Sequence, residues 1–389
     1  MEYKCPGCNG PLSFQEATQT MYCFYCDSHY SPSQFENHKI GASGIISGET
    51  KSHMRAREYI KMQTVVCNSC GAKLAVNDVE ASSYCAYCGQ PSVVIGRVED
   101  YLKPDYIIPF KITKQEAEEC IQKRLKKNHI LSGQLKDLDY EMCRGIYIPY
   151  WLFDIYFEDF QKWHIKLGKI SYFEVIYGNG SFEHFPVDAS DKLSDDLSQR
   201  IDPYDMEELI PFDAAYLSGF YSDRFDTPAE KAAEKAYDRL EYMLEKKIQK
   251  SLTGKKSRLW GNSPKGKIIK EEYALLPVWF FTYRSKEKVY TAIVNGQTGK
   301  VAGNFPPSKK RVAAIFTCLF LPLCFAIKNV TSGVFWNDRW IIPSFVIGLI
   351  IGILFWLIGW VLLDLNLALR EVSQQHMGEL VNNRQKKEE

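Results

Sequence analysis

The sequence opens with Cys5-Pro6-Gly7-Cys8 and continues, after fourteen residues, with Cys23-Phe24-Tyr25-Cys26. The same spacing returns 62 residues later as Cys67-Asn68-Ser69-Cys70 and Cys85-Ala86-Tyr87-Cys88. Identical spacing in two places indicates an internal repeat. A CxxC pair on a tight turn presents two thiolates to one ion, and two such turns joined by a short hairpin complete a tetrahedral set of four sulfurs. The pattern therefore predicts two zinc ribbons.

Eight cysteines are the predicted metal ligands: Cys5, Cys8, Cys23, Cys26, Cys67, Cys70, Cys85 and Cys88. Soft thiolates in sets of four favour structural Zn²⁺, so we expect two structural ions; iron, which S4 sites also bind, stays an alternative. Disulfides need an oxidising compartment, and residues 1–11 carry charge and two cysteines where a secretory signal would have an apolar run. A ribbon of about 25 residues builds no core of its own, so the metal would supply its folding free energy.

The charge balance argues against a dedicated nucleic-acid binder. The 389 residues hold 48 Lys+Arg and 47 Asp+Glu, a net charge of +1, whereas nucleic-acid binders normally show a basic excess. Residues 1–100 have eight basic and ten acidic side chains, and each Zn(Cys)₄ centre would add about −2. A local basic patch around Arg55 and Arg57 keeps nucleic-acid binding open as an alternative. A hydrophobic content of 46% excludes global disorder, and a mean hydropathy of −0.26 excludes a multi-span transporter.

Two apolar stretches near the C-terminus predict a membrane anchor. Residues 341–363 are 23 uncharged residues, and as a helix they would reach about 34 Å, enough to cross a hydrocarbon core. Residues 312–327 are uncharged but contain Pro322, so they read as a short first span, with a re-entrant segment as the alternative. Basic residues are more frequent outside this pair than in the loop between its members, which by the positive-inside rule puts both termini in the cytoplasm.

The middle of the chain shows one pattern twice. Residues 107–110 and 209–212 each precede an amphipathic stretch, and strand-like runs at 147–151 and 275–279 follow. Both helices are expected to begin with capping boxes, Thr113 to Glu116 and Thr227 to Glu230, the second with Pro228 at the first helical position. Hairpin turns are expected at Gly178-Asn179-Gly180 and at 296–299. The aromatic residues of the strand-like runs are expected in the core rather than in a ligand groove: Trp151, Phe153, Tyr156, Trp279, Phe280 and Phe281.

The expected fold class is multidomain α+β, with two small β zinc ribbons, an α+β domain of two similar strand-helix-strand lobes and a C-terminal transmembrane helical hairpin. The predicted units are zinc ribbon 1 (1–30), a linker (31–64), zinc ribbon 2 (65–96), the α+β domain with internal duplication (97–308), the transmembrane hairpin (309–370, with spans 312–330 and 341–363) and a cytoplasmic tail (371–389).

Motifs of established catalytic chemistry are missing from the sequence. It has no HExxH, GxSxG or GxxxxGK[ST], and its seven histidines are scattered. His29 lies three residues past Cys26 and could be a spare ligand, although four cysteines already close the set. Cys120 and Cys143 are expected to be buried, inert thiols. We expect no enzyme and no catalytic residue; catalytic groups dispersed in the sequence leave that hypothesis open.

Further motifs accompany the ribbons: Ile108-Pro109-Phe110-Lys111, Tyr150-Trp151-Leu152-Phe153-Asp154, Phe185-Pro186-Val187-Asp188-Ala189-Ser190, Leu217-Ser218-Gly219-Phe220-Tyr221 and Asn295-Gly296-Gln297-Thr298-Gly299-Lys300-Val301. Over nearly the whole chain, the sequence resembles bacterial TFIIB-type zinc-ribbon-containing membrane proteins. Its eight cysteines match their ligand positions one for one, and Asp27 stands where a glycine is common.

The resemblance implies no known reaction. It implies a membrane adaptor in envelope stress that recruits phage-shock-protein-A-type or SPFH/virion-core-type proteins. Together with the residues it leads to one expectation: a zinc-ribbon scaffold anchored in the cell membrane by two spans, with its partners being the lipid bilayer and such recruited proteins. The alternative is a tethered nucleic-acid-binding ribbon protein related to transcription or replication.

Overall fold

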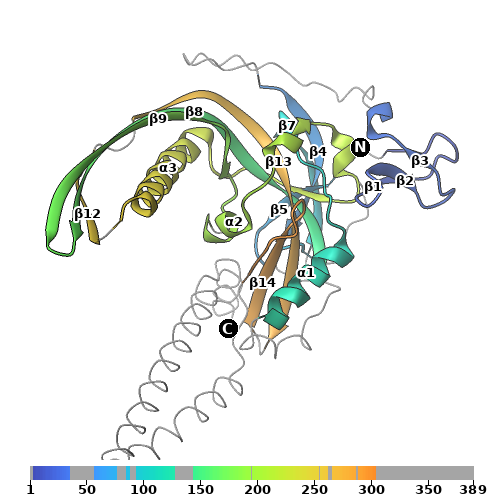
Figure 1. Cartoon of the computed structure of the whole chain (residues 1–389). Helices are drawn as coiled ribbons and strands as arrows, with labels where there is room; N and C mark the ends of the chain where they lie inside the picture. The colour runs from blue at the N-terminus through green and yellow to red at the C-terminus, as the bar shows by residue number, and fades with distance from the viewer. Residues whose placement is uncertain are drawn as a thin grey trace, which may run out of the picture.

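The computed structural model describes residues 3–35, 57–76, 85–87, 93–127, 143–193, 195–253, 255–261, 265–285 and 288–303. Within these ranges, no helix has the length and apolar character needed to span a bilayer. The apolar segments 312–330 and 341–363, the tail, most of the expected linker and Cys88 lie outside the described residues. The described part is a mixed α+β structure whose cysteine-rich β elements lie at its N-terminal end (Figure 1).

The first ribbon forms a small sheet of its own. Its strands are β1 (Leu12–Gln15), β2 (Thr20–Cys23) and β3 (His29–Tyr30), and the short 3-10 helix η1 (Pro32–Phe35) follows them. The order is β1-β2-β3, antiparallel throughout, with Leu12 opposite Cys23 and Met21 opposite Tyr30. The pleat alternates, so that Leu12, Phe14 and Met21 are buried.

All remaining strands belong to one twelve-stranded sheet. They are β4 (Tyr59–Cys67), β5 (Lys73–Val76), β6 (Val93–Leu102), β7 (Tyr106–Ile107), β8 (Cys143–Leu167), β9 (Ile170–Asp188), β10 (Ile210–Pro211), β11 (Tyr221–Asp223), β12 (Lys255–Gly261), β13 (Lys265–Ser285), β14 (Lys288–Asn295) and β15 (Val301–Gly303). The main order is β10-β7-β13-β8-β11-β5-β4-β6; β9 and β12 also pair with β8, β14 pairs with β13, and β15 with β14.

This strand order differs from the expected arrangement, in which zinc ribbon 2 precedes an α+β domain of two similar strand-helix-strand lobes. Strand β7 of the first expected unit lies between β10 and β13 of the second, so the two units alternate in one sheet. Strand β4 starts at Tyr59, inside the expected linker, and β5 pairs with β11. The cysteine turn between β4 and β5 is therefore built into the large sheet, because strands on both sides of it find partners there.

The helices cover this sheet. They are α1 (Lys114–Lys127), α2 (Asp195–Ile201), α3 (Ala229–Ser251) and the short 3-10 helices η4 (Met206–Glu208) and η5 (Ala214–Leu217). The expected capping box of α1 is confirmed: Glu116 N–H donates to Thr113 Oγ1 over 3.2 Å, and Thr113 N–H donates to Glu116 Oε2 over 2.8 Å. The helix buries Ala117, Ile121 and Leu125 on one face.

The second expected capping box is wrong. Helix α3 begins one residue later, with Pro228 as its N-cap and no side-chain cap. The Thr227 hydroxyl donates instead to Asp191 Oδ1 over 3.0 Å, and the Thr227 carbonyl accepts the indole N–H of Trp151. Tertiary hydrogen bonds thus occupy the residue that the local pattern assigns to a cap.

The long β8–β9 hairpin curves around α3, which lies on its concave side (Figure 1). The two strands pair from Tyr150 opposite Asp188 to Leu167 opposite Ile170, and the turn contains Gly168 at φ 63°. The expected turn at residues 178–180 is wrong, since these residues continue β9. A Cβ at Gly180 would lie 3.1 Å from the Phe157 ring, so glycine here permits close cross-strand packing. The other expected turn, at 296–299, is confirmed between β14 and β15.

The central strands are buried on both faces, which explains their nearly unbroken apolar sequence. In β8, Tyr147 and Trp151 belong to one hydrophobic cluster, whereas Ile148 and Leu152 belong to the other. Of the six aromatic residues expected in the core, five are buried, and only Tyr156 is 37% exposed.

Candidate metal centres

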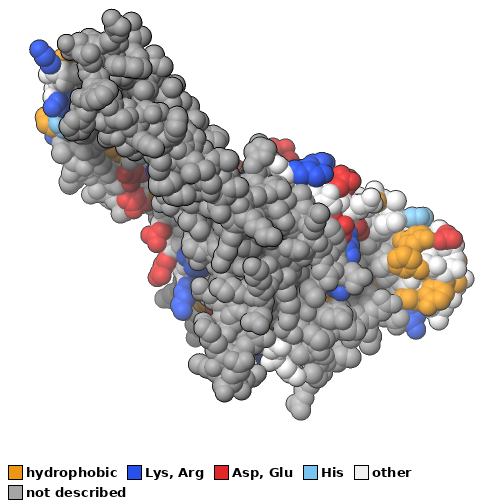
Figure 2. Space-filling model, turned by 90° about the horizontal axis from the view of Figure 1, so that it is seen from below, with side chains coloured by type: hydrophobic (Ala, Val, Ile, Leu, Met, Phe, Trp, Pro, Cys, Tyr) orange, Lys and Arg blue, Asp and Glu red, His pale blue; other side chains and the backbone are white. Residues whose placement is uncertain are grey.

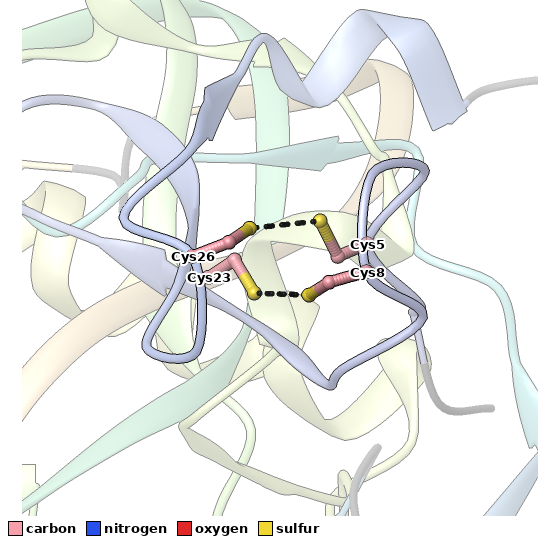
Figure 3. A group of neighbouring side chains, drawn as sticks. All are labelled: Cys5, Cys8, Cys23 and Cys26. Carbon is pink, nitrogen blue, oxygen red and sulfur yellow. Dashed lines mark hydrogen bonds between the residues drawn. The ribbon is translucent and has the colours of Figure 1, made fainter.

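Four cysteine side chains of the first ribbon converge on one point (Figure 3). Their sulfur atoms all lie within 4.8 Å of one another. Cys5 Sγ is 3.5 Å from Cys26 Sγ, and Cys8 Sγ is 3.4 Å from Cys23 Sγ. Zn–S bonds of about 2.3 Å in a tetrahedron imply S···S separations of about 3.8 Å. The four sulfurs therefore fit a zinc ion with only a small expansion.

Two similar backbone turns hold these cysteines. In the first, Asn9 N–H donates to the Cys5 carbonyl and Cys5 N–H donates to the Gly10 carbonyl. In the second, Asp27 N–H donates to the Cys23 carbonyl over 2.9 Å. Asn9 and Asp27 have φ of 61° and 54°, the left-handed region that Asn and Asp tolerate better than most residues. This explains why Asp27 can stand where the second half of the repeat has Gly89.

Tyr30 on β3 completes the surroundings of the cluster. Its hydroxyl lies 3.4 Å from Cys5 Sγ. This hydrogen bond is the main reason why the pKa of the Cys5 thiol falls to about 6. The hydrogen bond from the Gly10 backbone lowers the pKa of the Cys8 thiol. The hydrogen bonds between Cys8 and the Cys23 and Cys26 sulfurs raise this pKa, and the overall result is a pKa of about 12 for Cys8. Four close sulfurs thus compete for negative charge, a situation that a bound cation would relieve.

A second cluster joins Cys67, Cys70 and Cys85. Cys70 Sγ lies 3.7 Å from Cys85 Sγ. Gly71 N–H donates to the Cys67 carbonyl and Gly71 has φ 72°, which repeats the turn around Asn9. Both clusters could hold metal ions such as zinc. Cys88, the expected fourth ligand here, lies outside the described residues.

Tyr87 fastens this second cluster to the core of the large sheet. The side chain is fully buried, and its hydroxyl donates to Asp223 Oδ2 over 2.7 Å. Asp223 also accepts from Ser190 Oγ over 2.6 Å and from Lys192 Nζ over 3.0 Å. Burial raises the pKa of Asp223, and Lys192 opposes that change. The turn that supplies Cys85 is therefore tied by a charged, hydrogen-bonded network to β11 and to the end of β9.

The first ribbon docks on the same body at another place. Phe14 N–H donates to the Ser218 carbonyl over 3.0 Å, and Gln19 Nε2 donates to the Phe110 carbonyl over 2.6 Å. Phe14 and Tyr216 stack edge to face with ring centroids 4.9 Å apart. The ribbon therefore shares a hydrophobic core with the domain that follows it.

The remaining candidates take other roles. His29 Nδ1 lies 2.9 Å from Thr20 Oγ1, and His29 is not part of the four-sulfur cluster. Cys143 is buried, as expected, and Cys120 is partly buried; burial raises the pKa of both thiols. The roles of Tyr30 and Tyr87 were missed from the sequence. The repeat aligns Tyr87 with Tyr25, which is 75% exposed, so spacing alone could not separate an anchor from a surface residue.

The chain is similar over most of its length to one curated bacterial protein. The chain is 28% identical over 345 residues to a protein of Bacillus subtilis (strain 168) named "Uncharacterized protein YdjG". The two proteins are distant homologues. The match covers 85% of this chain and 97% of YdjG. No family model matches the chain, and no solved structure matches it.

Proposed function

We propose that the protein is a zinc-ribbon scaffold, anchored in the cell membrane, that recruits other proteins to the bilayer. The observation that carries this proposal is the four-cysteine cluster of the first ribbon, which holds two aromatic side chains in solvent. Phe24 and Tyr25 stand between Cys23 and Cys26 and are 73% and 75% exposed. Figure 2 shows hydrophobic side chains gathered at the end of the molecule that carries β1–β3.

The energetics favour a protein contact at this place. Exposed aromatic residues on a rigid support lose little conformational freedom on binding, and such residues commonly act as interface anchors. The turn beneath Phe24 and Tyr25 is fixed by its backbone hydrogen bonds and, on metal binding, by two metal–sulfur bonds. Phe24 also stacks edge to face on Tyr22, with ring centroids 4.8 Å apart. Two large aromatic rings are thus presented in a defined geometry.

The charge of the ribbon speaks against a phosphate backbone as its ligand. Residues 3–35 contain Lys4 as their only basic residue, besides the acidic Glu16 and Asp27. A zinc ion with four thiolates would add about −2 more. A phosphate backbone would be repelled rather than attracted. The tethered nucleic-acid binder therefore ranks second.

The apolar sequences at 312–330 and 341–363 are the basis for the anchor, with both termini expected in the cytoplasm. Cytoplasmic thiols stay reduced, which suits metal binding. The resemblance to envelope-stress adaptors suggests phage-shock-protein-A-type or SPFH/virion-core-type proteins as the recruited partners. The large sheet would hold the ribbons at a fixed distance from the anchor and would carry out no reaction.

The test is co-expression of the full chain with a phage-shock-protein-A-type protein, followed by flotation of the membranes. The wild type should carry the partner into the floating fraction, and the double variant Phe24→Ala/Tyr25→Ala should lose it. Tyr242→Ala on α3 is the matched control, because Tyr242 is also exposed, at 62%, far from the ribbon. Equal recruitment by all three proteins would refute a ribbon-mediated contact. If the chain itself is missing from the floating membrane fraction, the result would refute the membrane anchor instead.

Nucleic-acid binding has its own readout. The full chain in detergent is titrated against labelled single-stranded and duplex DNA over a range of salt concentrations. We expect no shift at moderate salt. A shift that weakens steeply with salt and disappears in the Phe24→Ala/Tyr25→Ala variant would favour the second function.

A further inference from the structure

The far end of the β8–β9 hairpin has an unusual sequence for a solvent-exposed turn. Residues 160–173 read Phe-Gln-Lys-Trp-His-Ile-Lys-Leu-Gly-Lys-Ile-Ser-Tyr-Phe, with three lysines, four aromatic residues and no acidic residue. The turn itself places Lys169 between two exposed apolar side chains, Leu167 at 52% and Ile170 at 66%. In Figure 1 this end of the hairpin lies at the left, farthest from the first ribbon.

One face of the hairpin is buried against the rest of the protein. Trp163 and Ile165 of β8 are buried with Leu252 at the end of α3. The indole N–H of Trp163 donates to Gln161 Oε1 over 2.9 Å. Ile248 of α3 packs against the same cluster, so this face of the hairpin is the concave one, on which α3 lies (Figure 1).

The other, convex face is apolar and basic at once. Successive residues alternate between the two faces, which puts exposed Phe173, Val175 and Tyr177 of β9 on this side at 62%, 56% and 63%. On β8 the exposed Lys162 lies opposite Val175, with its Nζ 5.2 Å from the Phe173 ring centroid, and the exposed Lys166 lies opposite Ser171. Apolar and cationic groups therefore share the surface at close spacing.

The neighbouring strand adds to the positive charge. Strand β12 pairs with β8 from Gln161 to Lys166, and its register places Lys255 opposite the exposed Lys166, whereas Lys256 and Arg258 lie opposite Ile165 and Trp163 of the concave face. Together, residues 160–173 and Lys255 contribute four basic residues and no acidic one. The chain as a whole is nearly neutral, so this end of the sheet stands out. Figure 2 shows basic, histidine and hydrophobic side chains side by side at the left end, where Figure 1 places the hairpin.

We propose that the convex face and turn of this hairpin bind an anionic lipid surface. Basic side chains are attracted to acidic headgroups, and exposed aromatic and aliphatic side chains enter the interfacial region, so the mixture of the two suits a bilayer. A single-stranded nucleic acid would also suit lysines and aromatic rings. It would leave Leu167, Ile170 and Val175 without a role, because aliphatic side chains offer no stacking partner for bases.

This contact goes beyond recruitment by the first ribbon and uses none of its residues. If the chain is also anchored through 341–363, the hairpin works at the high effective concentration that a tether provides, so even a weak contact would be populated. Two attachments would fix the orientation of the large sheet over the membrane and hold the ribbon away from it. An orientation set by acidic lipid would make presentation of Phe24 and Tyr25 depend on the lipid composition.

The test is lysine acetylation of the full chain in nanodiscs, read by mass spectrometry. One preparation contains phosphatidylcholine alone. In the other, about one third of the lipid is phosphatidylglycerol, which gives the disc surface a strongly negative potential. Lys162, Lys166 and Lys169 should react about fivefold more slowly in the anionic discs, the factor that corresponds to the attraction of one lysine to an acidic surface. The exposed Lys4, Lys61 and Lys73 at the ribbon end serve as internal controls and should react equally in both.

The double variant Leu167→Ser/Ile170→Ser distinguishes insertion of the turn into the bilayer from long-range attraction between the lysines and the anionic lipid. Both residues are exposed, so the variant should fold, which near-ultraviolet circular dichroism verifies. Protection of the three lysines should drop by at least half in this variant if the turn enters the bilayer. Equal reactivity in both kinds of disc would overturn the proposal, as would protection by single-stranded DNA in phosphatidylcholine discs. A chain that fails to enter discs would contradict the anchor alone, and the hairpin would then be tested by labelling with added vesicles of the same two compositions.

Discussion

Replacing Tyr87 by Phe tests whether the second cysteine cluster is structurally tied to the large sheet. Tyr87 is fully buried and donates to Asp223, whereas Tyr25, at the same position of the first ribbon, is 75% exposed. The two substitutions remove the same hydroxyl from the same place in the repeat. We expect Tyr87→Phe to destabilise the protein clearly and Tyr25→Phe to have almost no effect.

The magnitude follows from the partners of the lost group. A hydrogen bond to a charged partner contributes about 1.5–3 kcal/mol, and Asp223 keeps its bonds from Ser190 and Lys192 in the variant. We therefore expect a loss of about 2 kcal/mol in the free energy of unfolding for Tyr87→Phe and less than about 0.5 kcal/mol for Tyr25→Phe. Burial raises the pKa of Asp223 in the folded protein, so its ionisation costs stability as the pH rises above 3.8. Tyr87 lowers that cost, and the loss in the variant should shrink toward acidic pH.

The assay is urea unfolding of the full chain in detergent, with intrinsic fluorescence as the signal, at fixed zinc concentration. A second readout is the rate at which a chelator removes metal, because the Tyr87 turn carries Cys85. The Tyr87→Phe variant should release about one ion per chain faster than the wild type, while Tyr25→Phe should match the wild type. Equal midpoints and equal release rates for the two variants would refute the coupling between the metal centre and the sheet.

Three further outcomes are expected. Cys5→Ser should lower the bound zinc by about one ion per chain in elemental analysis, whereas Cys120→Ser should leave it unchanged; equal zinc content in both would contradict the first centre. Gly180→Ala should cost about 1 kcal/mol in urea unfolding because its new methyl group would lie 3.1 Å from the buried Phe157 ring, and a neutral or stabilising result would contradict tight packing at this place. The hydrogen bond from the backbone N–H of Thr113 lowers the pKa of Glu116 below its usual 4.5, so the stabilisation by this cap is present above that value and is lost as the pH falls through the lowered pKa. The stability difference between wild type and Glu116→Gln should accordingly vanish in strongly acidic buffer. A difference that grows there would contradict the claim that ionised Glu116 stabilises the start of α1.

Local patterns predicted well what local physics determines. The cysteine spacing identified seven sulfurs that the structure brings into two clusters, because a CxxC turn is closed by its own backbone hydrogen bonds. The capping box of Thr113 and Glu116 likewise involves only neighbours in sequence. The errors occur where distant groups compete for the same residue. The local pattern predicts a cap at Thr227, whose hydroxyl instead donates to Asp191, and a turn at Gly180, which instead lies against the Phe157 ring of the opposite strand.

The place of the second ribbon could not be predicted for the same reason. Its turn has the sequence of an independent ribbon, but strands β4 and β5 find hydrogen-bond partners in β6 and β11. Such partners are separated from it by up to about 150 positions of chain, and no spacing rule reaches that far. The outcome depends on which edges of the large sheet remain available.

The motifs that carry the family resemblance acquire a physical role from this arrangement. Phe110 and Ser218 accept hydrogen bonds from the first ribbon, and Ser190 helps to hold Asp223 for Tyr87 of the second. These motifs lie where a ribbon contacts the sheet, so their residues serve to attach the ribbons to the sheet. A ribbon connected only by a flexible linker would need no such partners. Because both ribbons are fixed to one sheet, we expect metal binding at either centre to stabilise the common body as well as the turn. The docking of the first ribbon on the sheet also sets the direction in which Phe24 and Tyr25 face.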